Sequence, residues 1–318
     1  MNKSLLSLLL VSSSLAAKPY VYLDVEGLYL LRCGSSRRQL ATYGYGADAT
    51  SAITSQNLIR SMSYEPCLRV AIGANNGAHG GFFRGLVAKG WSGNYNVTGT
   101  DDLYFPFNQM IEGYSVAQEV KSHYTNNLTV IEGYITRDLT PLWKQYFAFR
   151  GLMGLQYFNV PENVTLTFYK KLLGATRPDI NNYTASSNNN LGLASLGIMI
   201  QIRPYPVLAM EFLGLGGIGA SFIQAQTKCL KDNDKKVLKE SNNQAVTAGY
   251  SFMSTLRAVY RPVNWFQIGV GYELIYATGL CLAYKKMTKG VGYGSDGAIP
   301  LNGGVSYQGA SLRIGFSL

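Results

Sequence analysis

No apolar run in the sequence reaches the roughly 18–20 residues that a membrane-spanning helix requires. Charged residues make up only 14%, against roughly 25% in an average soluble domain, so the charged surface of an ordinary soluble enzyme is missing. A disordered chain is excluded as well, because 47% of the 318 residues are hydrophobic and that much apolar surface must be buried.

Histidine is scarce too, with His79 and His123 as the only two. Neither stands in a visible arrangement with a serine or a carboxylate of the kind that a hydrolase needs. We therefore predict two solvated loop histidines, no catalytic residue and no enzyme. No Cys-x-x-Cys spacing occurs, and with two histidines a zinc site has little support, so we expect no metal.

A glycine-rich stretch, Gly214–Gly219, matches the Gly-x-Gly-x-x-Gly spacing of dinucleotide-binding turns. That fingerprint requires a strand before it and a helix after it within a parallel βαβ unit, and here only the strand is indicated. We therefore expect no cofactor and interpret these glycines as part of a bent or closely packed strand.

What the sequence does have is 35 glycines, 23 tyrosines and a mean hydropathy of only +0.02. A membrane β-barrel has this composition, because lipid-facing apolar residues alternate with polar or small interior residues and cancel in the average. The fold class predicted is therefore all-β, a transmembrane antiparallel β-barrel.

The N-terminus indicates export. A basic start at Lys3, an apolar core over 5–11 and small residues up to Ala17 predict a signal peptide over residues 1–17, with an amphipathic helix as the alternative. Residues 18–318 are expected to form a single barrel domain.

Four cysteines, Cys33, Cys67, Cys229 and Cys281, lie far apart in the sequence. Export permits disulfides, and four cysteines allow three pairings. The alternative is that all four are small apolar fillers, and the sequence does not decide between the two.

Alternation with period two predicts about ten strands. In the most regular one, 265–277, the even-numbered residues Phe266 to Tyr276 face lipid and the odd-numbered Gln267 to Ala277 face the interior. The last strand is expected to pair with the first and close the barrel. The strands are 21–29, 68–74, 82–91, 128–137, 147–157, 194–203, 208–213, 246–260, 265–277 and 307–318; two more spans, 115–124 and 164–171, would raise the count to twelve.

Short turns and long polar stretches alternate along the chain. Pro141, Pro204 and Pro262 lie in short connectors, because proline cannot donate to a central ladder. We expect these turns on the periplasmic rim. Long extracellular loops are expected over 159–190, 228–244 and 283–303, as in outer-membrane barrels.

The same alternation places charged residues inside, in keeping with the cost of charge on a lipid-facing surface. Both signs of charge could line an aqueous pore or pair into a closed interior, and a barrel of about ten strands has a narrow lumen. The predicted pore-lining residues are Arg69, Arg150, Arg203, Arg257, Arg313, Asp24, Glu26, Glu132, Glu211 and Glu273.

Several short motifs resemble one family. The opening Tyr20–Leu30, the paired segments Val130–Tyr134 and Phe149–Leu152, Gly271–Glu273 and the closing Tyr307–Arg313 are similar to the Legionella major outer membrane protein family, which has relatives in chlamydia-like bacteria. The chain departs from that family in ending on Leu318 rather than phenylalanine. The resemblance implies an abundant porin or porin-like surface protein of the bacterial outer membrane, with no catalytic residues to carry over.

The expected function is passive diffusion of small solutes. The alternatives are a non-conducting structural or adhesive barrel and, with less support, a membrane-embedded hydrolase. The net charge of +10 is scattered, so we predict anionic solutes or lipopolysaccharide-like surfaces as partners, beside outer-membrane lipid, and no nucleic acid. A homo-oligomer and contacts to a host surface through the loops remain open.

Overall fold

The structure is a computed structural model that describes residues 19–34, 37–44, 49–105, 116–140, 147–170, 178–231, 236–287 and 298–318. The predicted signal peptide over 1–17 and the turn residue Pro141 lie outside these residues. The strands are β1 Tyr20–Cys33, β2 Gln39–Tyr43, β3 Thr50–Thr54, β4 Glu65–Asn75, β5 His79–Tyr104, β6 Ala117–Asp138, β7 Phe147–Lys170, β8 Asp179–Tyr205, β9 Leu208–Lys231, β10 Lys236–Val263, β11 Phe266–Leu280 and β12 Gly303–Ser317. The described helices are α2 Ser55–Arg60 and α3 Ala283–Met287.

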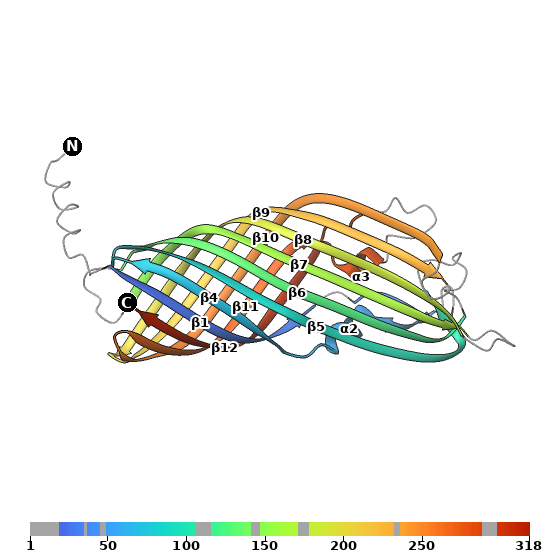
Figure 1. Ribbon diagram of the computed structural model, residues 1–318, viewed down its shortest axis with the longest axis horizontal. Coiled ribbons are helices and arrows are strands. Elements are labelled where there is room, and N and C mark those ends of the chain that lie inside the picture. Colours follow the sequence, from blue (N-terminus) through green and yellow to red (C-terminus); the bar gives the residue numbers. More distant parts are fainter. Residues whose placement is uncertain are drawn as a thin grey trace.

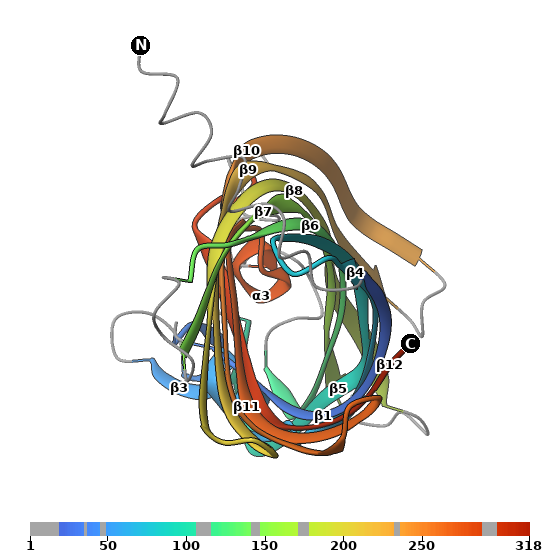
Figure 2. The same cartoon turned by 90° about the vertical axis from the view of Figure 1, so that its left-hand side faces the viewer.

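Ten of these strands close into an antiparallel ring in the order β5-β4-β1-β12-β11-β10-β9-β8-β7-β6, and β6 pairs with β5 again (Figures 1 and 2). The short β2–β3 hairpin is attached to the far part of β5. The chain is thus an all-β transmembrane antiparallel barrel, and the prediction of about ten strands is confirmed. The two extra spans, 115–124 and 164–171, do not add strands, because they continue β6 and β7.

The predicted register is confirmed along the closing strands. In β12 Leu312, Ile314 and Phe316 are exposed on the outside, and Ser311 and Gly315 are buried. The first and last strands pair from Tyr22↔Ser317 to Cys33↔Ser306, so no sheet edge is left along this seam.

The two- and three-residue turns between β4 and β5, β8 and β9, and β10 and β11 lie at one end of the barrel, which we call the turn rim. The β8–β9 turn follows Tyr205 and the β10–β11 turn follows Val263, at the end where Tyr20 and Leu318 also lie (Figure 1). This agrees with the short-turn rim predicted around Pro204 and Pro262.

The predicted long loops are wrong over most of their length. Residues 159–170 continue β7, residues 179–190 begin β8, and 228–231 and 236–244 belong to β9 and β10. The third stretch contains α3. β10 has 28 residues, about 90 Å of strand, whereas about 9–11 residues suffice to cross a bilayer. The barrel therefore extends well beyond the lipid at the end away from the turn rim, which we call the far half.

The strands extend into the far half on one side of the barrel only. Strands β5 to β10 have 22–28 residues, whereas β1, β4, β11 and β12 have 11–15. The segments that follow the short strands β1 and β11 carry α2 and α3. α3 contacts β7, β8 and β9 and lies inside the ring in the view along the barrel (Figure 2), while α2 contacts β5, β6 and β1.

The two faces of the wall exchange polarity along the barrel. Near the turn rim the outward residues are apolar, and those of β12 from Ala310 to Leu318 cover nine residues, the length that a tilted strand needs to cross hydrocarbon. In the far half the outward positions become polar, as at Asn188 and Gln224, while the inward ones become apolar, as at Phe158 and Leu191. Within the described residues no helix is long and apolar enough to cross a membrane.

Candidate functional site

Near the turn rim the interior contains a network of ion pairs. Its central part joins two arginines with two glutamates: Arg69 Nη1 lies 2.9 Å from Glu26 Oε2 and 3.1 Å from Glu273 Oε1. Arg257 contacts the same two carboxylates, lying 3.4 Å from Glu273 and forming an ion pair with Glu26. The four side chains are at least nine-tenths buried, so the charges compensate one another where water is scarce.

A second part of the network lies on the wall formed by β5 and β6. Arg84 Nε and Nη2 donate to Glu132 at 2.5 and 3.2 Å, and Tyr134 and Gln156 donate to the same carboxylate at 3.0 Å each. Glu132 therefore accepts four hydrogen bonds, which stabilises its ionised form inside the barrel.

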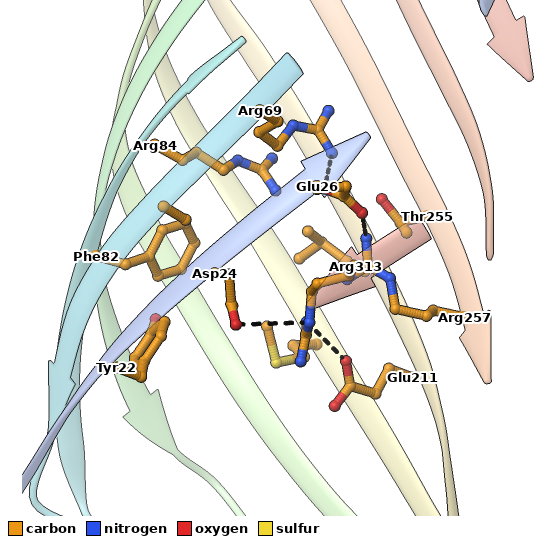
Figure 3. A pocket seen from close by; sticks show the side chains of 13 residues that line it. Tyr22, Asp24, Glu26, Arg69, Phe82, Arg84, Glu211, Thr255, Arg257 and Arg313 are labelled. Atoms are coloured by element: carbon orange, nitrogen blue, oxygen red, sulfur yellow. Dashed lines mark hydrogen bonds and ion pairs between the residues drawn. The ribbon is translucent and has the colours of Figure 1, made fainter. Parts of the chain in front are cut away.

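A third part lies closest to the turn rim, and its residues Asp24, Glu211 and Arg313 are labelled in Figure 3. The Glu211 carboxylate forms ion pairs with Arg261, at 3.0 Å from Nη2, and with Arg313, at 3.2 Å from Nη1. The Asp24 carboxylate lies 3.7 Å from Arg313 Nε. Eight of the ten predicted pore-lining residues are thus joined in ion pairs. Arg150 and Arg203 form no ion pair with a described residue, and they line a cavity by the turn rim that Asp24, Glu211 and Arg313 also line.

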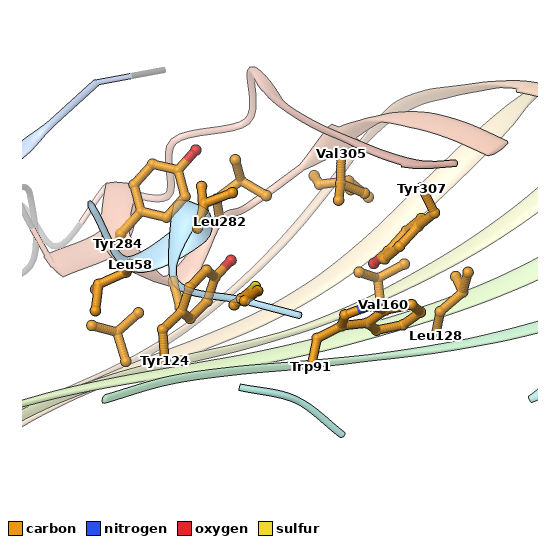
Figure 4. Close-up of a cluster of buried hydrophobic side chains, with 14 of the residues drawn as sticks. Leu58, Trp91, Tyr124, Leu128, Val160, Leu282, Tyr284, Val305 and Tyr307 are labelled. Atoms are coloured by element: carbon orange, nitrogen blue, oxygen red, sulfur yellow. The ribbon is translucent and has the colours of Figure 1, made fainter. Parts of the chain in front are cut away.

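Farther from the turn rim, the interior is an apolar core that reaches from wall to wall (Figure 4). Trp91 of β5 packs on Tyr307 of β12 with ring centroids 4.7 Å apart, and the Tyr307 hydroxyl donates to Asn126 of β6 at 2.6 Å. Leu30, Val130, Phe158 and Leu191 are all fully buried in this layer. Side chains from opposite strands therefore fill the lumen here, as in the core of a water-soluble protein.

The segment Cys281–Met287, which we call the plug segment, is bound to the long strands β7 and β8 by polar side chains. Asn189 of β8 donates to Cys281 O at 3.1 Å and accepts from Cys281 N at 2.8 Å. Glu162 of β7 accepts from Ala283 N at 3.0 Å, and Tyr183 donates to Met287 O at 2.8 Å. These bonds satisfy main-chain groups that the plug segment brings into the barrel.

Glu162 also pairs with Arg32 across the barrel, at 2.6 Å, and both side chains are fully buried. Arg32 donates in addition to the Tyr124 hydroxyl at 2.5 Å. This ion pair links the short strand β1 to the long strand β7, next to the plug segment.

The four cysteines are free thiols in the structure. Cys67, Cys229 and Cys281 are buried and Cys33 is half-buried. Burial raises the pKa of the Cys281 thiol, which lies beyond the end of β11, to about 12. A thiol with so high a pKa is a weak nucleophile at neutral pH.

The histidines lie in different parts of the barrel. His79 is exposed at the start of β5, where its backbone N–H donates to Asn76 Oδ1, and His123 lies 2.7 Å from Asn94 on the outer surface of the far half. Groups of three or more histidine, cysteine or acidic residues arranged to hold a metal ion are absent from the described residues.

The glycine stretch Gly214–Gly219 lies within β9. A Cβ on Gly217 would come within 2.6–3.0 Å of side-chain oxygens of Ser251, Gln156 and Ser195, and one on Gly219 would meet Gly192 O. The close packing of this strand accounts for both glycines without a nucleotide.

Sequence reasoning missed Arg84, Arg32 and Glu162. Arg84 could have been found, because alternation from an outward Phe83 places it inside. Arg32 and Glu162 could not, because Arg32 lies beyond the strand expected over 21–29 and Glu162 lies in the loop expected over 159–190.

Comparisons with solved structures return outer-membrane barrels. The chain is similar to the outer membrane protease OmpT from Escherichia coli at 11% identity, over 94% of this chain and 96% of that one, with a TM-score of 0.46. A Pseudomonas aeruginosa FadL homologue matches at 9% identity over 94% and 90%, with a TM-score of 0.28. An anion-selective porin from Comamonas acidovorans matches at 11% over 95% and 99%, with a TM-score of 0.18. No protein-family model and no curated protein matches the chain.

Proposed function

We propose that the chain is a bacterial outer-membrane protein with a closed barrel, which presents its far half outside the cell as a structural or adhesive surface. The apolar outer belt next to the turn rim supports a membrane location for that half of the barrel. Polar outward side chains make the surface of the far half suited to water. Asn159, for example, donates to the side-chain oxygens of Asn188 and Asn190 at 2.7 and 2.9 Å.

The observation that carries this proposal is the filled interior. Trp91, Tyr307 and Phe158 occupy the lumen in one layer, and the plug segment lies beyond it. Passive diffusion needs a continuous aqueous path, and a wall-to-wall apolar layer opposes one.

The porin function expected from the sequence is the second candidate. It is favoured by the charged interior near the turn rim and by a cavity of about 700 Å³ that opens there. For the chain to act as a porin, the plug segment and the side chains of the apolar layer would have to move apart and open the lumen.

Conductance decides between the two. We expect the refolded full-length chain to give no steady current in planar bilayers, while folding is confirmed by a heat-dependent shift in gel mobility. A steady ohmic current from folded protein would contradict the closed barrel and support the porin. Lipid or peptide hydrolysis that disappears when His79 and His123 are replaced would instead favour an enzyme.

A further inference from the structure

The cavity at the turn rim has an excess of positive charge. It measures about 700 Å³ and is bounded by β1, β7, β8, β9, β12 and the β10–β11 turn. Its charged side chains are four guanidinium groups and two carboxylates, a side-chain charge of four minus two, or +2: Arg150, Arg203, Arg261 and Arg313 with Asp24 and Glu211. Leu318 lines the cavity too, and its terminal carboxylate lowers the sum to +1.

The two guanidinium groups that have no carboxylate partner can be assigned to particular residues. Arg261 and Arg313 both pair with Glu211, and Asp24 lies beside Arg313, so these four side chains compensate one another. Arg203 donates through Nε and Nη2 to the neutral amide oxygen of Gln201, at 2.9 and 2.6 Å. Among the described residues no carboxylate lies within ion-pair distance of Arg150 or Arg203.

We propose that this cavity binds an oxyanion, a phosphate or carboxylate group, through Arg150 and Arg203. A guanidinium binds such groups through two parallel hydrogen bonds, and it keeps its charge at every physiological pH. Because both arginines come from inward positions of the neighbouring strands β7 and β8, the rigid sheet places them on one wall of the cavity. The volume lies within the range of small-molecule sites.

The remaining lining suits the body of a small organic anion. Tyr20, Tyr22 and Trp265 contribute aromatic rings to the cavity. Because the turn rim borders the apolar belt, the anion has two sources: a free solute, or the phosphate of a lipid headgroup at the membrane surface. The proposal does not depend on whether the barrel conducts, since the cavity lies on the turn-rim side of the apolar core.

Inorganic phosphate is the first probe, added to the folded full-length chain in zwitterionic micelles and followed by calorimetry and by tryptophan fluorescence. We expect saturable binding that weakens roughly tenfold or more in Arg150→Gln and in Arg203→Gln, as for the loss of a charge-assisted hydrogen bond. Arg137→Gln is the matched control, because Arg137 is exposed on the outer face at the same rim and does not line the cavity.

Reconstitution into nanodiscs distinguishes the sources. If phosphatidylglycerol discs abolish phosphate binding while phosphatidylcholine discs preserve it, the occupant is a lipid headgroup; equal binding in both indicates a free solute. Absence of saturable binding to the wild-type chain would overturn the proposal. So would an equal loss in Arg137→Gln, because the effect would then be one of net charge. If Arg150→Gln does not fold, Arg203→Gln, at a more exposed side chain, decides alone.

Discussion

The side chain of Asn189 binds the main chain of Cys281 in both directions, donating to its carbonyl oxygen at 3.1 Å and accepting from its N–H at 2.8 Å. Asn189 also donates to Val160 O at 3.0 Å, and it is fully buried. One amide therefore joins β7, β8 and the start of the plug segment, and replaces the strand partner that Cys281 would otherwise need.

Replacing this amide is expected to release the plug segment. In Asn189→Leu the N–H and C=O of Cys281 lose their partners, which costs about 2 kcal/mol or more of unfolding free energy. Trypsin should then cleave after Lys285 or Lys286 faster than in the wild type, as read by mass spectrometry. Asn188→Leu is the control, since Asn188 is on the outer face. Equal cleavage rates in the two variants would show that Asn189 does not hold the segment.

The Arg84–Glu132 pair gives a second prediction. Glu132→Leu leaves a buried guanidinium without its carboxylate, and we expect a loss of about 3–5 kcal/mol in urea unfolding from micelles. The double variant Arg84→Met with Glu132→Leu removes both charges and should recover most of that loss. A double variant as unstable as the single one would mean that the pair acts through packing rather than charge.

The closing strand β12 gives a third prediction. Phe316 faces lipid and its ring lies 5.6 Å from that of Phe266, whereas Ser317 has the inward phase. Phe316→Asp should therefore prevent membrane assembly, because a carboxylate in lipid is costly and closure of the ring is cooperative. Ser317→Asp should be tolerated. Heat-modifiable gel mobility of membrane fractions measures both, and the reverse result would mean a register shifted by one residue.

The orientation in the membrane is tested by thiol labelling of intact cells in a Cys33→Ser background, where the three remaining cysteines are buried. Gln224→Cys, on the outer face of the far half, should react with a membrane-impermeant maleimide. Val207→Cys, in the β8–β9 turn, should react only after the outer membrane is permeabilised. Labelling of Val207→Cys alone in intact cells would reverse the proposed orientation.

The ring and its register could be predicted because lipid imposes a strict alternation on the outer face. In β11 the pattern from Phe266 to Tyr276 needs no knowledge of other strands, and the turn at Val263–Phe266 follows from Pro262 and its neighbours. The inward phases of Arg150 and Arg203 follow from the same alternation.

The far half could not be predicted, because there the alternation is inverted. The asparagines, serines and threonines over 179–190 predict a loop, yet this segment is an extended strand. Its outward residues, such as Thr184 and Asn188, face water, and its inward positions include Tyr183 and Asn189. The Arg32–Glu162 pair joins residues 130 positions apart, and only the closed ring brings them together.

The exchange of polarity between the two halves also determines where this chain can change. In the far half every second residue of a strand faces outward into water, whereas its neighbours along the chain are fixed by the core and the plug segment. Asn188, Gln224 and Glu240 could thus be exchanged for other hydrophilic side chains while Tyr183, Phe158 and Asn189 keep their positions. Such a protein can alter its water-facing surface without refolding a single strand.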